Sequence, residues 1–106
     1  MKIFFITFLG FCFFLFMQSC SQPPFACFQT DVNEDSIHVN QVVTFNTACS
    51  INANEYYWDF SDSEDSVFYT NIVKRKFNDT GNVSVFLLVT KGRKTSSITK
   101  DIHVNP

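Results

Sequence analysis

The feature that most constrains the fold is a period of two in the apolar residues of the C-terminal half. Along residues 83–90 (VSVFLLVT), apolar side chains recur at every second position, as they do on one face of an extended strand. Four side chains share this face: Val83, Val85, Leu87 and Val89. Residues 55–60 (EYYWDF) repeat the pattern with Trp58 and Phe60. No stretch of ten residues keeps the 3.6-residue period of an amphipathic helix, so the sequence predicts an all-β domain.

Further short segments rich in β-branched and aromatic residues are separated by polar turns. The expected strands are residues 25–30, 36–39, 41–47, 55–60, 67–69, 72–77, 83–90 and 96–104. Many short strands with turns between them are typical of a sandwich or a barrel.

The N-terminus has a different character from the rest of the chain. Residues 3–17 contain seven phenylalanines and no charged side chain, and they follow Lys2. These 15 residues fall short of the roughly 18 to 20 that span a bilayer as a helix. Their length and their basic flank fit a secretory signal peptide instead. We therefore expect residues 1–19 to be removed from the mature protein.

Residues 17–20 (MQSC) resemble a bacterial lipobox, in which the cysteine is lipidated and becomes the first residue after cleavage. The resemblance implies that Cys20 carries two or three acyl chains such as palmitate, enough for stable anchoring. Residues 20–24 then form the lipidated cysteine with a short tether, and residues 25–106 form the domain. The alternative is an ordinary signal peptide cleaved near Ser19 or Ser21. Because Ser21 stands where aspartate favours inner-membrane retention, we expect an outer-membrane location.

Composition limits the function of the mature chain. Without Lys2 it has seven basic and ten acidic side chains, a net charge of −3, which argues against nucleic-acid binding. A domain of fewer than 90 residues buries only about 60 % of its unfolded surface and gains from a covalent link. No catalytic motif is present, and we expect no enzyme activity.

Two cysteines remain in the expected domain, Cys27 and Cys49. If residues 25–31 and 42–49 pair antiparallel with a register sum of 76, these cysteines face each other. An exported protein permits a disulfide, which would stabilise the fold by roughly 3 kcal/mol. The alternatives are two buried thiols, or a metal site with His38 and His103. The spacing of these residues does not match a zinc motif, so we expect no metal.

A family resemblance extends over residues 25–105. Residues 56–62 (YYWDFSD) are similar to the signature Y-x-W-D-F-G-D-G of PKD (polycystic kidney disease-type) domains. A V-x-F strand precedes it at residues 43–45. Phe77 stands before the next turn, and residues 81–89 (GNVSVFLLV) resemble the family's G-x-Y-x-V-x-L-x-V strand.

The resemblance implies an immunoglobulin-like β-sandwich of about seven strands. It also implies a non-catalytic module for protein or glycan contacts, or for spacing other domains. Four residues carry the signature turn: Trp58, Asp59, Phe60 and Asp62. Ser61 and Ser63 replace the two glycines of the family signature, so the turn must avoid or tolerate positive φ.

The signature leads into an acidic turn. Carboxylates occur at Asp59, Asp62, Glu64 and Asp65. Calcium prefers several oxygen ligands on a flexible loop, so this turn is a candidate calcium site. The competing interpretation is that Asp59 and Asp62 accept backbone hydrogen bonds and fix the turn. The ligand pattern is incomplete, and we expect no cofactor.

The outward face of the longest expected strand is unusually apolar. Phe86 and Leu88 stand where PKD domains usually have polar residues. With Tyr57 and His103 on neighbouring strands, they predict an apolar binding face for a protein or glycan. The alternative is that the loop at residues 62–71 covers them.

Three consecutive basic residues, Lys74, Arg75 and Lys76, alternate across an expected strand. They are interpreted as a solvated edge that discourages aggregation, or less readily as a contact with anionic lipids. Taken together, the sequence predicts a non-catalytic envelope lipoprotein that presents a PKD-like binding module. The alternatives are a structural subunit or spacer of an envelope complex, and a small glycan-binding protein.

Overall fold

Strands form where the apolar alternation predicted them. The computed structural model describes residues 22–62 and 67–106, and these residues contain strands and turns without an α-helix. The strands are β1 (Gln29–Thr30), β2 (Ile37–His38), β3 (Val43–Asn46), β4 (Glu55–Phe60), β5 (Val67–Phe68), β6 (Ile72–Arg75), β7 (Gly81–Lys91) and β8 (Lys94–Asn105). The all-β prediction is confirmed. Within the described ranges, no helix could span a membrane.

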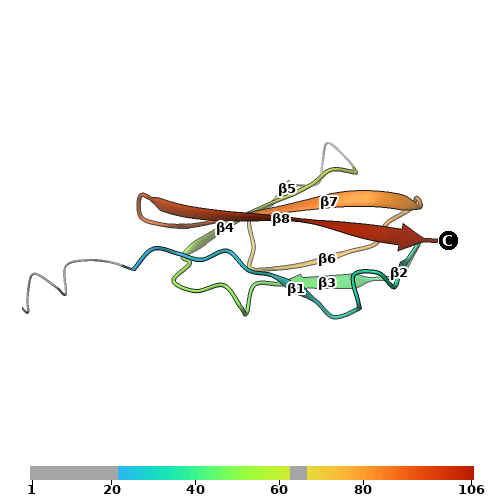
Figure 1. Cartoon of the computed structure of the whole chain (residues 1–106), viewed down its shortest axis with the longest axis horizontal. Coiled ribbons are helices and arrows are strands. Elements are labelled where there is room, and N and C mark those ends of the chain that lie inside the picture. Colours follow the sequence, from blue (N-terminus) through green and yellow to red (C-terminus); the bar gives the residue numbers. More distant parts are fainter. Residues whose placement is uncertain (1–21, 63–66) are drawn as a thin grey trace, which may run out of the picture.

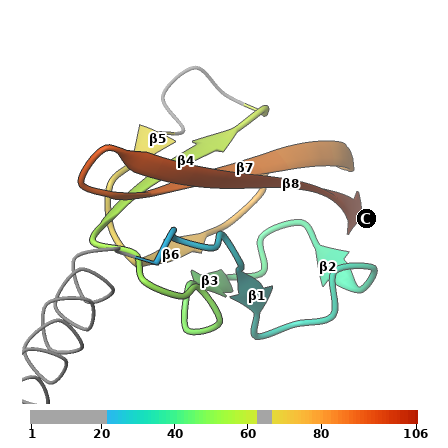
Figure 2. The ribbon, with the colours of Figure 1, turned by 60° about the vertical axis from the view of Figure 1, so that its left-hand side comes forward.

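The strands form two sheets that pack as the layers of a sandwich (Figures 1 and 2). The smaller sheet has the order β1-β3-β6, and its pairs are antiparallel. The larger sheet has the order β2-β8-β7-β4-β5. Its pairs are antiparallel except for the short parallel pair of β2 with β8.

The longest elements, β7 and β8, form one hairpin that runs the length of the large sheet. Its turn is Gly92-Arg93, between the paired residues Lys91 and Lys94. Only Gly92 has a positive φ, at 62°, which is the pattern of a type II′ turn. Such turns match the right-handed twist of the flanking strands, which explains how the hairpin stays paired over eleven residue pairs.

The core lies between the two sheets and is strongly aromatic. The predicted inward face of β7 is confirmed, because Val83, Val85, Leu87 and Val89 are all buried. Phe45 of the small sheet and Phe60 of the large sheet lie with ring centroids 5.1 Å apart across the interior. Trp58 is fully buried, and its indole Nε1 donates a hydrogen bond of 2.7 Å to the carbonyl of Thr70. The one polar atom of this buried side chain is therefore satisfied.

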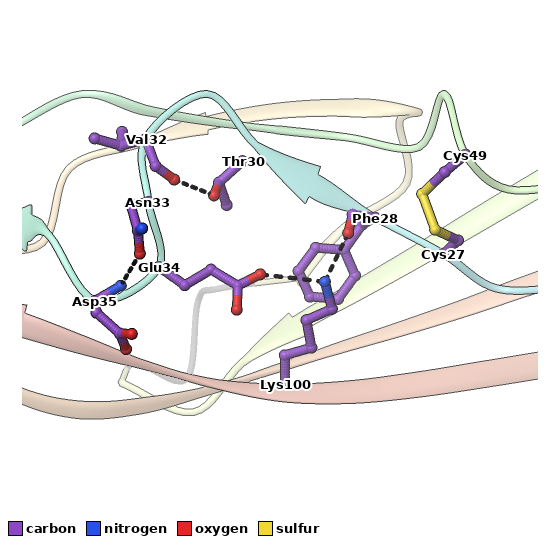
Figure 3. Close-up of polar contacts among 9 residues, drawn as sticks. All are labelled: Cys27, Phe28, Thr30, Val32, Asn33, Glu34, Asp35, Cys49 and Lys100. Carbon is purple, nitrogen blue, oxygen red and sulfur yellow. Dashed lines mark hydrogen bonds and ion pairs between the residues drawn. A yellow bond between two sulfur atoms is a disulfide. The ribbon is translucent and has the colours of Figure 1, made fainter.

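Cys27 and Cys49 form the predicted disulfide, with 5.3 Å between their Cα atoms (Figure 3). The assumed register was correct only at this end of the pairing. Phe25 pairs with Ile51, which gives the sum of 76, whereas β1 and β3 pair with a sum of 75. The stretch from Asn46 to Ile51 therefore contains one residue more than the stretch from Phe25 to Gln29 with which it pairs. A turn at residues 47–50 accommodates this extra residue.

Candidate functional site

The outer surface of the large sheet gathers aromatic side chains from three neighbouring strands. Tyr57 of β4 lies opposite Leu88 of β7. Its ring makes edge contacts with Phe86, at 6.3 Å between centroids, and with Tyr69, at 5.7 Å. We call Tyr57, Tyr69, Phe86 and Leu88 the aromatic face. The prediction that Tyr57, Phe86 and Leu88 lie together agrees with this geometry, while their role in binding stays a prediction.

Tyr69 was not foreseen, and it changes the character of this surface. It follows β5 directly and is 72 % exposed, whereas Tyr57, Phe86 and Leu88 are partly buried. Tyr69 adds an exposed ring at the rim of the face, and residues 63–66 of the same segment lie outside the described residues. The signal was present in the sequence, because Tyr69 continues the alternation of Val67 in an expected strand.

Polar groups border the aromatic rings. A shallow pocket of about 200 Å³ is lined by Glu55, Tyr56, Tyr57, Tyr69, Leu88 and Thr90. Along β8, the residues opposite Thr90, Leu88 and Phe86 form a row of hydroxyls: Thr95, Ser97 and Thr99. All three are exposed. The face thus combines flat apolar rings with a carboxylate and several hydroxyls, which can contact apolar and hydrogen-bonding groups of one ligand.

His103 does not join the aromatic face. It pairs with Asn82 near the other end of the β7–β8 hairpin, four positions along β8 from the partner of Phe86. A hydrogen bond of 2.8 Å joins its Nδ1 to Asn82 Oδ1. His103 therefore lies on the same side of the sheet as the aromatic face but apart from it along β8, and its expected role in binding stays a prediction.

The signature residues divide between the core and the surface. Trp58 and Phe60 are buried, whereas Asp59 is exposed opposite Phe86. Asp62 accepts two hydrogen bonds from the guanidinium of Arg75, at 2.7 and 3.0 Å. Trp58 and Phe60 thus pack in the core, and Asp62 holds the turn against β6.

Ser61 shows how the turn forms without the first family glycine. Its φ is not positive, and its backbone N–H and its Oγ both bond to the backbone of Ser84 on β7. Glycine's conformational freedom is therefore not needed at this position. Ser63, Glu64 and Asp65 lie outside the described residues, and elsewhere in the structure no three metal-ligating side chains cluster.

Lys100 is a polar residue at an inward position of β8, opposite Val85 (Figure 3). Its Nζ donates to the carbonyl of Phe28 at 2.9 Å and to Glu34 Oε1 at 3.1 Å. It also lies 4.7 Å from the centroid of the Phe28 ring. The side chain therefore spans the gap between β8 and the segment before β1, and its ammonium reaches the rim of the sandwich. This contact was not predicted, although a lysine in an otherwise apolar alternation was its signal.

The three basic residues at 74–76 have separate roles. β6 is an edge strand of the small sheet, which agrees with the solvated-edge interpretation for the exposed Lys74 and Lys76. Arg75 is instead partly buried, with its guanidinium 4.7 Å from the Phe60 ring and 4.9 Å from the Phe77 ring.

The expected lipidation site, Cys20, lies outside the described residues. Of the expected tether, residues 20–24, Pro24 is buried against the domain.

Two solved structures are similar to this fold. One is described as carbohydrate-binding modules from the β-sandwich superfamily, with a TM-score of 0.68 and 31 % sequence identity. That likeness covers 79 % of this chain and only 35 % of the other, so this chain spans about a third of its length. The second is the PKD1 domain of the Vibrio cholerae metalloprotease PrtV, with a TM-score of 0.64 and 21 % identity, over 80 % of this chain and 100 % of that domain.

No protein-family model matches the sequence, and no curated protein does so. The family assignment therefore depends on structure and on the signature residues together. The sheet order, the buried Trp58 and the likeness to a PKD domain agree with the expectation from residues 56–62. The chain folds as a PKD-like β-sandwich domain.

Proposed function

We propose that this protein is a non-catalytic glycan-binding module, held on the cell envelope by a lipidated Cys20. The observation that carries the proposal is the aromatic face, where the exposed Tyr69 ring rests against Tyr57 beside a pocket with polar borders. The likeness to carbohydrate-binding modules supports the glycan as ligand. The signal-like N-terminus and the lipobox-like residues 17–20 support the envelope location, with the outer membrane as the preferred site.

The chemistry of the aromatic face suits a sugar. A pyranose ring has an apolar face of C–H groups, which packs on an aromatic ring, and a rim of hydroxyls, which need hydrogen-bond partners. Tyr69 and Tyr57 offer the rings, and Glu55 and Thr90 line the same pocket with an acceptor and a hydroxyl. The pocket of about 200 Å³ is smaller than the roughly 300–1,000 Å³ of sites that enclose a whole ligand. It therefore suits one sugar ring of a longer chain lying across the hydroxyl row of β8.

The test is retention of the purified protein on insoluble cellulose, chitin and peptidoglycan, and on gels containing soluble β-glucan or xylan. We expect Tyr69→Ala to weaken binding to the retained glycan at least about fivefold, since a ring contact of roughly 1 kcal/mol or more is lost. Tyr69 is 72 % exposed, so the substitution leaves the core intact. The matched control is Phe25→Ala, which removes an aromatic ring that is 58 % exposed and lies outside the aromatic face.

Equal retention of wild type and Tyr69→Ala would contradict the proposed site. The alternative is a subunit within an envelope complex. It would be supported if the protein were retained on none of the glycans but captured an envelope protein, and if Phe86→Ser with Leu88→Thr abolished that capture. That alternative is favoured by the apolar, partly buried Phe86 and Leu88, which extend the face beyond the size of one sugar ring.

A further inference from the structure

One end of the sandwich brings together the start of the described chain, two exposed apolar side chains and a basic turn. The described residues begin at Gln22, and the backbone N–H of Ala26 donates a hydrogen bond of 3.0 Å to Ser96 Oγ, near the start of β8. The β7–β8 turn therefore lies beside the first described residues, as Figures 1 and 2 both show. We call Phe25, Ile51 and residues 91–94 the proximal end.

The apolar part of the proximal end is a cross-strand pair. Phe25 and Ile51 exchange backbone hydrogen bonds of 2.9 and 3.1 Å, which hold the two side chains as neighbours. Phe25 is 58 % exposed and Ile51 is 57 % exposed, although both belong to residue types that are usually buried. The disulfide of Cys27 and Cys49 fixes the segments that carry them. This exposed pair is therefore held in place and does not belong to a loose terminus.

Basic charge is concentrated at the same end. Residues 91–94 hold three of the seven basic side chains that follow Cys20: Lys91, Arg93 and Lys94. Glu55, opposite Thr90 in the large sheet, is the acidic residue nearest to the turn in the strand register.

The far end of the sandwich carries an acidic loop. The loop at residues 31–35 has three acidic residues, and Asn105 at the end of β8 donates to the Asp35 carbonyl at 3.1 Å. Both signs of charge occur at this end, because Lys76 lines a pocket with Gly81 and Asn82, whereas residues 91–94 at the proximal end carry basic charge alone.

The chain between the expected anchor and the fold is short. Cys20 and Phe25 are five residues apart, a distance of at most about 17 Å when fully extended. Pro24 is already buried, and Pro23 restricts the remaining chain. A lipid on Cys20 would thus hold the proximal end within reach of phosphate headgroups.

We propose that the proximal end is a docking surface for a membrane leaflet that contains anionic phospholipids. The proposal rests on the lipid anchor of the proposed function. The three basic side chains contact lipid phosphates, and Phe25 and Ile51 enter the boundary between headgroups and acyl chains. The domain then stands with β7 and β8 directed away from the bilayer. In this orientation the aromatic face lies on the side of the domain, where it stays accessible to a ligand.

The test uses the full lipidated protein with Ile51→Trp as a reporter, placed in vesicles whose lipids have brominated acyl chains. The native Trp58 is fully buried and serves as a constant background. We expect quenching of the reporter in vesicles of phosphatidylcholine with phosphatidylglycerol, and much less quenching in phosphatidylcholine alone. Lys91→Ser with Arg93→Ser should lower the ratio of docked to undocked protein about 25-fold, since each basic residue contributes about fivefold.

The matched control is Lys74→Ser with Lys76→Ser, which removes the same charge from exposed positions on and just after β6 and should leave quenching unchanged. Two results would overturn the proposal for protein that remains bound to the vesicles. One is the absence of quenching, and the other is quenching that is equal in both lipid compositions and unchanged by Lys91→Ser with Arg93→Ser. Protein that stays off both kinds of vesicle would contradict the anchor itself, and the docking surface with it.

Discussion

Removal of the disulfide by Cys27→Ala with Cys49→Ala is the most informative perturbation of stability. The crosslink closes a loop with a sequence separation of 22, which in the chain-entropy model stabilises the fold by about 3 kcal/mol. The native structure should survive this change. Ser50 Oγ accepts a hydrogen bond of 3.0 Å from the Cys27 N–H and donates one of 2.6 Å to the Cys27 carbonyl, so the segment stays in place.

The loss should therefore arise mainly in the unfolded chain, which gains freedom when the crosslink is absent. Urea unfolding followed by tryptophan fluorescence should show a free energy of unfolding lower by about 3 kcal/mol, with a larger m value because more surface becomes exposed. For a domain of this size the midpoint temperature should fall by roughly 12 to 24 °C.

Chemical reduction provides the matched control for this variant. Reduced wild type should unfold like the double variant, and the reductant should leave the double variant unchanged. A loss below about 1 kcal/mol with an unchanged m value would refute the argument from chain entropy.

Two further predictions concern polar groups in the core. Lys100→Met keeps the apolar stem but removes the ammonium from the Phe28 carbonyl and ring, and should lower the free energy of unfolding by about 1 to 2 kcal/mol in urea titration. Glu34→Gln should lower it by less than about 1 kcal/mol, because the ion pair of Glu34 with Lys100 is partly exposed. Equal losses would contradict the carbonyl contact as the main role of Lys100. Trp58→Phe leaves the Thr70 carbonyl without its donor and should cost about 1 to 3 kcal/mol, measured by urea titration with circular dichroism because the variant lacks the single tryptophan. An unchanged stability would show that this hydrogen bond is not needed.

Much of the fold could be predicted from the sequence because its strands alternate strictly. A period of two determines which residues share a face, so the buried set of β7 follows directly from Val83, Val85, Leu87 and Val89. The disulfide was predictable for a different reason, since the expected domain contains only two cysteines. The pairing register could not be predicted, because one additional residue in a turn at residues 47–50 changes it and leaves no mark in the alternation.

The candidate site was only partly predictable. Alternation placed Tyr57, Phe86 and Leu88 on the outer surface, but it could not say how far along the sheet each side chain lies. His103 therefore lies farther from these residues than the alternation suggested, and Tyr69 was overlooked although it continues the alternation of Val67. The proximal end depends on the segment around Ala26 lying beside a hairpin turn about 70 residues later, and no local pattern contains that information.

The central claim is that this is an anchored envelope protein whose domain is closed by a disulfide. Intact mass with non-reducing peptide mapping, on protein purified from its native membrane, tests it most directly. We predict a chain that begins at Cys20, carries the mass of two or three acyl groups, and contains a Cys27–Cys49 crosslinked peptide. A chain without acyl mass, cleaved near Ser19 or Ser21, would contradict the account and leave a secreted sandwich without an anchor.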